Sequence, residues 1–151
     1  MALIKSISGI RGTIGGSVGS NLTPIDIVKF TSAFVTVIKK NNPNTLTFIV
    51  GRDARVSGEM VSQLVCATLQ SMGVHVIDLG LSTTPTVEMA VIQQKADGGV
   101  ILTASHNPME WNALKLLNAK GEFISGAEGK ELLQIAESED FTYNSVRELG
   151  S

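Results

Sequence analysis

The sequence predicts an α/β fold whose central sheet is mixed and mostly parallel. The main observation is that short apolar runs at residues 47–50, 74–79 and 99–103 alternate with helix-like segments. Consecutive parallel strands need a long crossover, usually a helix, and parallel strands buried on both faces are continuously apolar. After residue 113 the pattern changes, and two short apolar segments flank a glycine-containing turn. We therefore expect parallel strands with an antiparallel addition.

The first helix is predicted to begin directly after Thr23. Thr23 is a common N-cap residue, Pro24 suits the first helical position, and Asp26 lies three residues after Thr23, as in a capping box. Apolar residues then recur at helical spacing until the sequence Asn-Asn-Pro-Asn at residues 41–44 ends the pattern.

A charged turn follows the apolar run at residues 47–50. Arg52, Asp53 and Arg55 lie within four residues of one another. We expect Arg52 and Asp53 to form a structural pair that orders this turn.

The second helix is predicted to begin at Ser57 and to end at Gly73. Ser57 is interpreted as the N-cap, and Glu59 adds an acidic side chain to the first turn. The elements expected next are a strand at residues 74–79, a helix at about 86–94 and a strand at 99–103.

The C-terminal third is predicted to hold a hairpin and one more helix. Strands at residues 114–118 and 122–124 flank a turn in which Gly121 takes a positive φ. A last helix covers about residues 127–137, and the polar residues after it resemble a linker.

Composition excludes several classes of function. The 151 residues are 43% hydrophobic and 17% charged, with a net charge of −2, so we expect one globular domain that binds neither nucleic acid nor membranes. No apolar run approaches about 20 residues, and the N-terminus lacks a signal peptide, which favours the cytoplasm. Cys66 lies on the apolar face of the second helix and is expected to be a buried, reduced thiol.

Polar residues gather where the predicted parallel strands end. Ligands of open α/β sheets bind outside the carboxyl ends of the strands. Three such ends, at residues 51–57, 80–85 and 103–108, are rich in small, polar and charged side chains. The candidates at this edge are Arg52, Asp53, Arg55, Ser57, Ser82, Thr83, Thr84, Ser105, His106 and Asn107.

Ser105 and His106 are the most reactive pair at this edge. Neighbouring side chains of an extended segment point to opposite sides, so His106 is poorly placed to be the general base of a serine hydrolase. The Gly-x-Ser-x-Gly pattern is also missing, since Thr103 and Asn107 occupy the glycine positions. The other histidine, His75, starts an apolar strand, and no cluster has the spacing of metal ligands.

The remaining chemistry is covalent phosphoryl transfer through Ser105. A phosphorylated serine needs cationic neighbours, and Lys115 lies on the next predicted strand. A glycine-rich segment at residues 8–16 carries a single arginine, Arg11. It has neither the Walker nor the dinucleotide pattern, and from these residues alone a phosphate-binding loop and a flexible surface loop both stay open.

These motifs together are similar to those of the α-D-phosphohexomutase superfamily. Residues 103–108, Thr-Ala-Ser-His-Asn-Pro, resemble its active-site signature. Ala113 departs from the pattern, because the family usually has glycine there. Four further segments match in order along the chain: Gly9-Ile10-Arg11-Gly12, Gly51-Arg52-Asp53-Ala54-Arg55-Val56-Ser57-Gly58, residues 80–85, and Asn112-Ala113-Leu114-Lys115.

The resemblance implies a fold and a division into domains. Members of the superfamily have four domains, and this chain resembles the first, a three-layer α/β/α sandwich. Residues 1–140 would form that domain, and residues 141–151 would start the linker to a second one.

The resemblance also implies roles for individual residues. Ser105 would be the phosphoserine, and an oxygen of its phosphate would be a Mg²⁺ ligand. Lys115 and Arg11 would flank the transferring phosphoryl group, with Lys115 as a candidate general acid and base. The implied contacts to phosphate or substrate are Arg11, Gly12, Ser105, His106, Asn107 and Lys115, of which Arg11, Ser105, His106 and Lys115 would be catalytic.

The implied reaction interconverts a hexose 1-phosphate and a hexose 6-phosphate through a hexose bisphosphate intermediate. The remaining Mg²⁺ ligands, the sugar-recognition loop and a second phosphate-binding loop would come from the three other domains, so we expect the isolated chain to be inactive. The residues of these motifs most resemble those of phosphoglucosamine mutases, and phosphoglucomutase/phosphomannomutase is the second candidate. The alternative is a noncatalytic sugar-phosphate-binding domain of the same fold.

Overall fold

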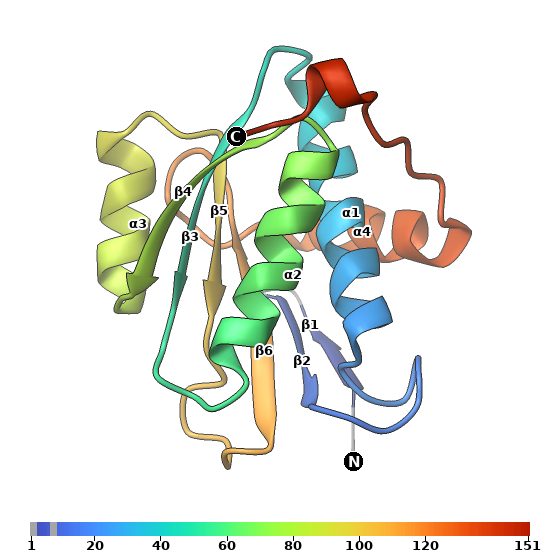
Figure 1. Cartoon of the computed structure of the whole chain (residues 1–151), viewed down its shortest axis with the longest axis vertical. Coiled ribbons are helices and arrows are strands. Elements are labelled where there is room, and N and C mark those ends of the chain that lie inside the picture. The colour runs from blue at the N-terminus through green and yellow to red at the C-terminus, as the bar shows by residue number, and fades with distance from the viewer. Residues whose placement is uncertain (1–2, 7–8) are drawn as a thin grey trace.

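The computed structural model describes residues 3–6 and 9–151, so Ser8, at the start of the glycine-rich segment, lies outside the described residues. Its elements are labelled in Figure 1. In chain order they are β1 (Leu3–Ser6), β2 (Gly9–Thr13), α1 (Pro24–Asn41), β3 (Thr47–Arg52), α2 (Gly58–Ser71), β4 (His75–Leu81), α3 (Thr84–Gln93), β5 (Gly98–Leu102), β6 (Trp111–Leu117), α4 (Gly126–Ser138) and a short 3₁₀ helix, Val146–Glu148.

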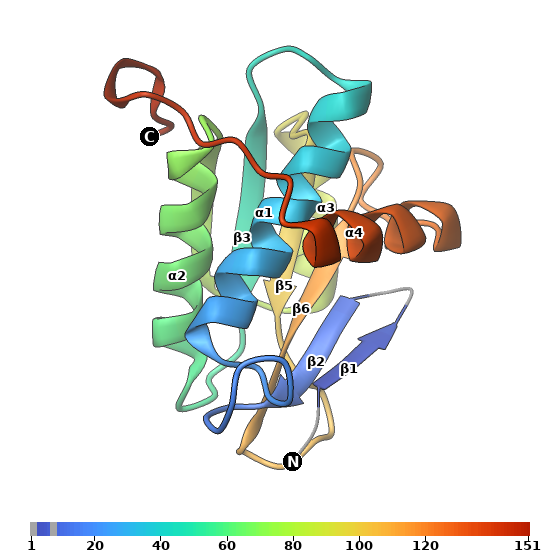
Figure 2. The ribbon, with the colours of Figure 1, turned by 90° about the vertical axis from the view of Figure 1, so that its right-hand side faces the viewer.

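The described strands form one mixed sheet in the order β1-β2-β6-β5-β3-β4. β3 pairs in parallel with β4 and β5, whereas the pairs β5–β6, β6–β2 and β2–β1 are antiparallel. Figures 1 and 2 show α3 on one face of the sheet and α1, α2 and α4 on the other. The predicted three-layer α/β/α sandwich is therefore confirmed, with a larger antiparallel part than expected.

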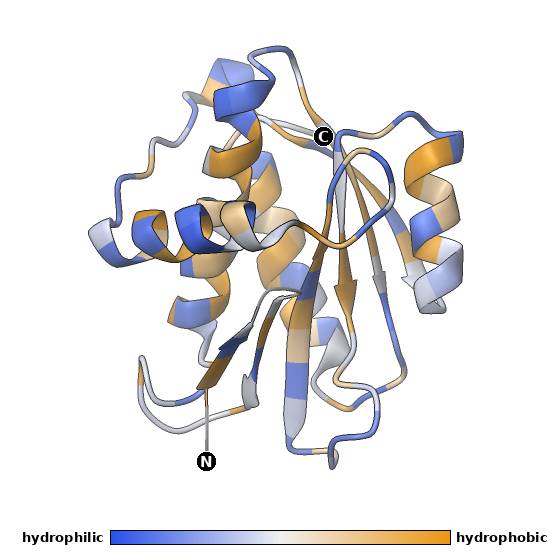
Figure 3. Ribbon diagram, turned by 180° about the vertical axis from the view of Figure 1, so that it is seen from behind, coloured by the Kyte–Doolittle hydropathy of each residue, from blue (hydrophilic) through white to orange (hydrophobic). Residues whose placement is uncertain are grey.

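The apolar core lies mainly between the sheet and the three helices α1, α2 and α4, with a smaller cluster under α3. Figure 3 shows apolar residues along the central strands, whereas the connecting loops are mostly hydrophilic. β5 is buried along its whole length, as its continuous apolar run predicts. β4 is half exposed instead of buried, because among the described strands only β3 lies beside it.

Local capping signals account for the start of α1 but not for the start of α2. Thr23 and Asp26 form the predicted capping box, with Pro24 in the first turn. Ser57 is the N-cap residue of α2, as predicted, but its side chain makes no capping hydrogen bond. The Ser57 hydroxyl instead accepts a hydrogen bond from Asn112 Nδ2 at 2.9 Å, so it connects α2 to the start of β6.

The antiparallel half of the sheet holds the main differences from the predicted elements. Residues 9–13, expected as part of a loop, form β2, which lies between β1 and β6. The predicted turn is present, with Gly121 at a φ of +73°. Its second arm is a single bridge between Phe123 and Leu117 rather than a strand at residues 122–124.

The C-terminal residues return to the body of the domain. The amide of Asn144 donates to Ser71 O and the amide of Gly150 to Gln70 O, both at 2.8 Å. The amide of Val76 in turn donates to Ser151 O at 2.9 Å. These bonds join the last residues to the end of α2 and the start of β4.

Two further expectations concern the helices. No helix in the described part of the chain is long and apolar enough to cross a membrane. Cys66 on α2 is a free, half-buried thiol, and its burial raises the pKa of the thiol group.

Candidate active site

The candidate site lies below the arrowheads of β3 and β5 in Figure 1, where these strands end and β6 begins. β3, β4 and β5 are parallel, so the loops that follow them share one edge of the sheet, as predicted. After β3 the chain enters α2 on one face, and after β4 it enters α3 on the other. The loops after β3 and β5 therefore flank the point where the strand order of the sheet reverses. Open α/β sheets bind ligands at such points.

A cavity of about 230 Å³ brings most of the predicted site residues together. Its lining consists of Arg11, Ala104, Ser105, His106, Asn107 and Lys115. Gly12 is the exception, since it is buried in β2 opposite Asn112 and does not line the cavity.

Two neighbouring antiparallel strands supply the cations of the cavity. Arg11 on β2 pairs with Ala113 on β6, and Lys115 follows two residues later. Because alternate residues of a strand share one face, Arg11, Ala113 and Lys115 lie on the same face of the sheet.

Ser105 is the nucleophile candidate, and its hydroxyl lies beside Lys115. Lys115 Nζ donates to Ser105 Oγ at 2.7 Å, and the Ser105 amide donates to Thr103 Oγ1 at 3.1 Å. Ser105 has a φ of +53°, in the left-handed region. This conformation costs a residue with a side chain roughly 1–2 kcal/mol, so the surroundings must hold Ser105 there.

The cavity is electropositive. Among the described residues, Arg11 and Lys115 are its permanent charges, and no carboxylate lines it. Arg11 Nη1 donates to Asn107 Oδ1 at 3.4 Å, and its guanidinium carbon lies 5.8 Å from the centre of the Trp111 ring, a cation–π distance. Such a cavity suits a phosphoryl group, which carries between one and two negative charges near neutral pH.

Arg55 holds the loop that carries Ser105, a role that sequence analysis did not assign to it. Its Nη1 donates to Pro108 O at 2.7 Å and to Trp111 O at 3.1 Å. Its Nη2 donates to Ser105 O and to Asn107 O, each at 2.8 Å. Arg55 thus spans the segment from the nucleophile to the start of β6.

The ion pair at this turn differs from the predicted one. Asp53 pairs with Arg55, Nε to Oδ2 at 3.2 Å, and not with Arg52. Asp53 Oδ1 also accepts the backbone amide of Arg55, which directs the carboxylate toward residue 55. Arg52 donates instead to the backbone carbonyl of Asp53 at 3.2 Å.

The residues of this cavity do not form a Mg²⁺ site by themselves. Mg²⁺ prefers octahedral oxygen coordination, usually with carboxylates or phosphates. Ser105 and Asn107 are the only oxygen-bearing side chains in the lining, and each already accepts a hydrogen bond from a cation. In the described residues, no group of three His, Cys, Asp or Glu side chains could hold a metal ion.

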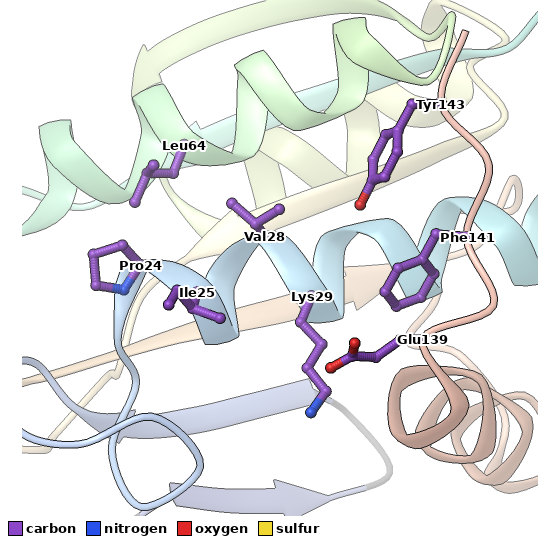
Figure 4. Close-up of a pocket in the computed structure, with 8 residues that line it drawn as sticks. All are labelled: Pro24, Ile25, Val28, Lys29, Leu64, Glu139, Phe141 and Tyr143. Carbon is purple, nitrogen blue, oxygen red and sulfur yellow. The ribbon is translucent and has the colours of Figure 1, made fainter.

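A larger and mostly apolar pocket of about 500 Å³ lies between α1, α2 and residues 139–143 (Figure 4). It shares no lining residue with the cavity at Ser105. Its one hydroxyl belongs to Tyr143 and is hydrogen-bonded to Ser32 Oγ at 2.9 Å. Of the two, the cavity at Ser105, although smaller, is the one in which a serine hydroxyl lies beside a cation.

Comparison with protein families agrees with this architecture. The model described as "Phosphoglucomutase/phosphomannomutase, alpha/beta/alpha domain I" matches residues 3–143. That range contains every residue that lines the cavity.

Individual relatives match over nearly the whole chain. A phosphoglucomutase/phosphomannomutase of Thermococcus kodakarensis is 38% identical over 92% of this chain and 31% of its own length. A phosphoglucosamine mutase of Helicobacter pylori is 32% identical over 91% of this chain and 31% of its own length. This chain thus spans less than a third of the curated relatives.

A solved structure shows the same fold. A phosphoglucomutase/phosphomannomutase family protein of Burkholderia thailandensis matches 98% of this chain and 32% of its own, with a TM-score of 0.80 and 25% identity. On the family match, the relatives and the shared fold, this chain belongs to the phosphoglucomutase/phosphomannomutase family and corresponds to its α/β/α domain I.

Proposed function

We propose that this domain belongs to a phosphohexomutase that interconverts a hexose 1-phosphate and a hexose 6-phosphate, with Ser105 as the phosphoryl carrier. The observation that carries the proposal is the contact of 2.7 Å between Lys115 Nζ and Ser105 Oγ. It lies in a cavity that has two cations and no carboxylate. This arrangement favours a hydroxyl that gives and takes a phosphoryl group.

In the first transfer, a hydroxyl oxygen of the sugar phosphate attacks the phosphorus of phosphorylated Ser105. The new oxygen–phosphorus bond forms as the bond from phosphorus to Ser105 Oγ breaks, and the product is a hexose bisphosphate. The attacking hydroxyl loses its proton to a base, while Ser105 Oγ takes one from the Lys115 ammonium group. Arg11 neutralises charge on the phosphoryl oxygens during the transfer.

The second transfer runs in the opposite direction on the other phosphate of the intermediate. The neutral Lys115 amine accepts the proton of the Ser105 hydroxyl, whose oxygen attacks phosphorus. The new hexose monophosphate leaves and takes up one proton, and phosphorylated Ser105 is restored. His106 and Asn107, which line the same cavity, would contact the phosphate or the sugar.

The proposal includes Mg²⁺, which when bound would neutralise charge on the phosphoryl group. Phosphorylated Ser105 would supply one oxygen ligand, and residues outside this domain would supply the others. The same holds for sugar recognition, so residues 141–151 would lead into a second domain. The proposed location is the cytoplasm, and neither nucleic acid nor a membrane takes part.

The sugar is proposed from the names of the relatives. Several are named phosphoglucosamine mutases, and others phosphoglucomutase/phosphomannomutase. We therefore place hexosamine phosphates first and glucose or mannose phosphates second among the substrates to test.

The test is an assay of full-length protein with the 1-phosphates of glucosamine, glucose and mannose in the presence of Mg²⁺. We expect the corresponding 6-phosphate to appear and turnover to vanish in Ser105→Ala. The exposed Ser20→Ala is the matched control and keeps full activity. Turnover that survives in Ser105→Ala contradicts the role of Ser105. Binding without turnover in every variant supports the noncatalytic alternative.

A further inference from the structure

Arg55 binds backbone carbonyl groups of residues 105–111, here called the catalytic loop, and does not line the cavity at Ser105. We propose that Arg55 is a positioning residue, which holds Ser105 in the backbone conformation that phosphoryl transfer requires. The inference rests on the proposed role of Ser105 as phosphoryl carrier. It assigns to the charged turn after β3 a function beyond a structural one.

The guanidinium group of Arg55 is fully occupied by hydrogen bonds within the protein. A guanidinium has five N–H donors, and each donor of Arg55 has a partner. Four of them meet the carbonyl oxygens of Ser105, Asn107, Pro108 and Trp111 at 2.7 to 3.1 Å. The fifth meets the Asp53 carboxylate. A lysine has three donors at one point and cannot reproduce this set.

The Arg55 side chain is largely buried and lies outside the cavity lining. The Arg55 side chain is only 11% exposed, whereas Arg11 is an exposed residue that lines the cavity. Arg55 does not line the cavity and has no donor left for a substrate. It therefore acts on the reaction through the loop, and not by touching the phosphoryl group.

Arg55 is bonded to a residue in an unfavourable backbone conformation, Ser105. Its φ of +53° is unfavourable for a residue with a side chain, and its own carbonyl is one of the four that Arg55 holds. The described chain has no cis peptide bond, so the N–H of His106 lies opposite the Ser105 carbonyl and points away from Arg55. Arg55 thereby fixes the peptide group directly after the nucleophile.

The position of Arg55 is itself fixed. Asp53 accepts both the backbone amide and Nε of Arg55, each at 3.2 Å. A second connection joins Ser57 to Asn112 just beyond the loop. The residues after β3 thus hold both the loop after β5 and the start of β6.

The first test uses the 151-residue chain and does not depend on catalysis. Amide hydrogen exchange is measured by NMR in Arg55→Lys, Arg55→Met and the wild type. The amides of Asn107 and Trp111 close turns within the loop, by donating to Ala104 O and Pro108 O at 3.0 Å. We expect them to exchange about tenfold faster or more in both variants, because the loop opens locally, while the amides of β5 keep their protection.

Arg52→Lys is the matched control. Arg52 lies in the same turn, and its hydrogen bond goes to the carbonyl of Asp53 and not to the catalytic loop. In Arg52→Lys the amides of Asn107 and Trp111 should exchange as in the wild type. Unchanged exchange in folded Arg55 variants would overturn the inference. So would loss of folding in both variants, because Arg55 would then be a residue of global stability.

The second test measures kcat and KM in the full-length protein. A displacement of about 1 Å can cost roughly 100-fold in rate, so we expect kcat to fall about 10- to 100-fold in Arg55→Lys and further in Arg55→Met. KM for the hexose phosphate should stay within about twofold, since Arg55 does not touch the substrate. Arg52→Lys should keep both constants.

The two hypotheses fail in different ways. A wild-type protein that turns over normally, with kcat unchanged in both Arg55 variants, would overturn the positioning role alone. A wild-type protein with neither turnover nor a phosphate on Ser105 would overturn the proposed function, while the exchange experiment still decides whether Arg55 holds the loop.

Discussion

At the scale of single residues, the pair Ser105 and Lys115 determines what this surface can do. A serine hydroxyl is a weak nucleophile and a poor leaving group unless a neighbour handles its proton. Lys115 reaches Ser105 Oγ at 2.7 Å from the neighbouring strand, whereas His106 is adjacent in sequence. The pair therefore favours chemistry in which charge on Ser105 Oγ is compensated by a cation, as in phosphoryl transfer.

Replacing Lys115 tests this pairing. In Lys115→Met the ammonium group is lost while most of the side-chain volume stays, so we expect kcat of the full-length protein to fall about 100-fold or more. The matched control is Lys120→Met, because Lys120 is exposed in the turn after β6. Steady-state kinetics with a hexose 1-phosphate check the prediction, and a Lys115→Met protein that retains wild-type kcat contradicts it.

The sequence places Arg55 at the same edge as the reactive side chains but does not predict that Arg55 holds the loop of Ser105. Ser105, Lys115 and Arg11 carry groups whose chemistry points to phosphate. Arg55 donates hydrogen bonds to backbone carbonyl groups, which every residue has, so the sequence does not show which residues Arg55 contacts. The predicted pairing of Asp53 with Arg52 was wrong, because Asp53 accepts both the backbone amide and Nε of Arg55.

At the scale of elements, local signals explain which segments could be predicted. α1 begins at the position that Thr23, Pro24 and Asp26 predict, because a capping box is made by residues close in sequence. β2 has no such signal: it has five residues, two of them glycine, and becomes a strand only between β1 and β6. Its position beside β6 is what brings Arg11 near Lys115.

The N-cap of α1 allows a direct measurement of one local signal. Thr23→Ala removes the side-chain oxygen that accepts the Asp26 amide, and we expect the free energy of unfolding to fall by about 0.5–2 kcal/mol. Urea denaturation of the 151-residue chain measures the change. The exposed Thr45→Ala makes the same chemical change outside a helix and should leave stability nearly unaltered. Equal effects of the two substitutions would show that the cap adds no stability.

At the scale of the whole molecule, this domain supplies the proposed phosphoryl carrier Ser105. Ser105 and His106 are exposed, and the cavity between them and Lys115 measures only about 230 Å³. Its relatives are about three times longer than this chain. The proposed function therefore assigns the rest of the substrate site to residues outside this domain.

The isolated chain is therefore expected to fold without being a mutase. Its strands and helices bury two apolar clusters, one on each face of the sheet, and its last residues bind back to α2 and β4. A circular-dichroism spectrum should show mixed helix and strand, whereas a coupled assay with hexose 1-phosphates should show no turnover above background. Turnover by the 151 residues alone would contradict the need for further domains.

The most direct test of the central claim is the mass of the full-length protein after incubation with a hexose bisphosphate. We expect the added mass of one phosphoryl group, on the peptide that contains Ser105, and its loss when a hexose monophosphate is added. The Ser105→Ala protein should take up no phosphoryl group. A protein that turns over hexose phosphates while Ser105 stays unmodified, or carries the phosphoryl group on another residue, would contradict it.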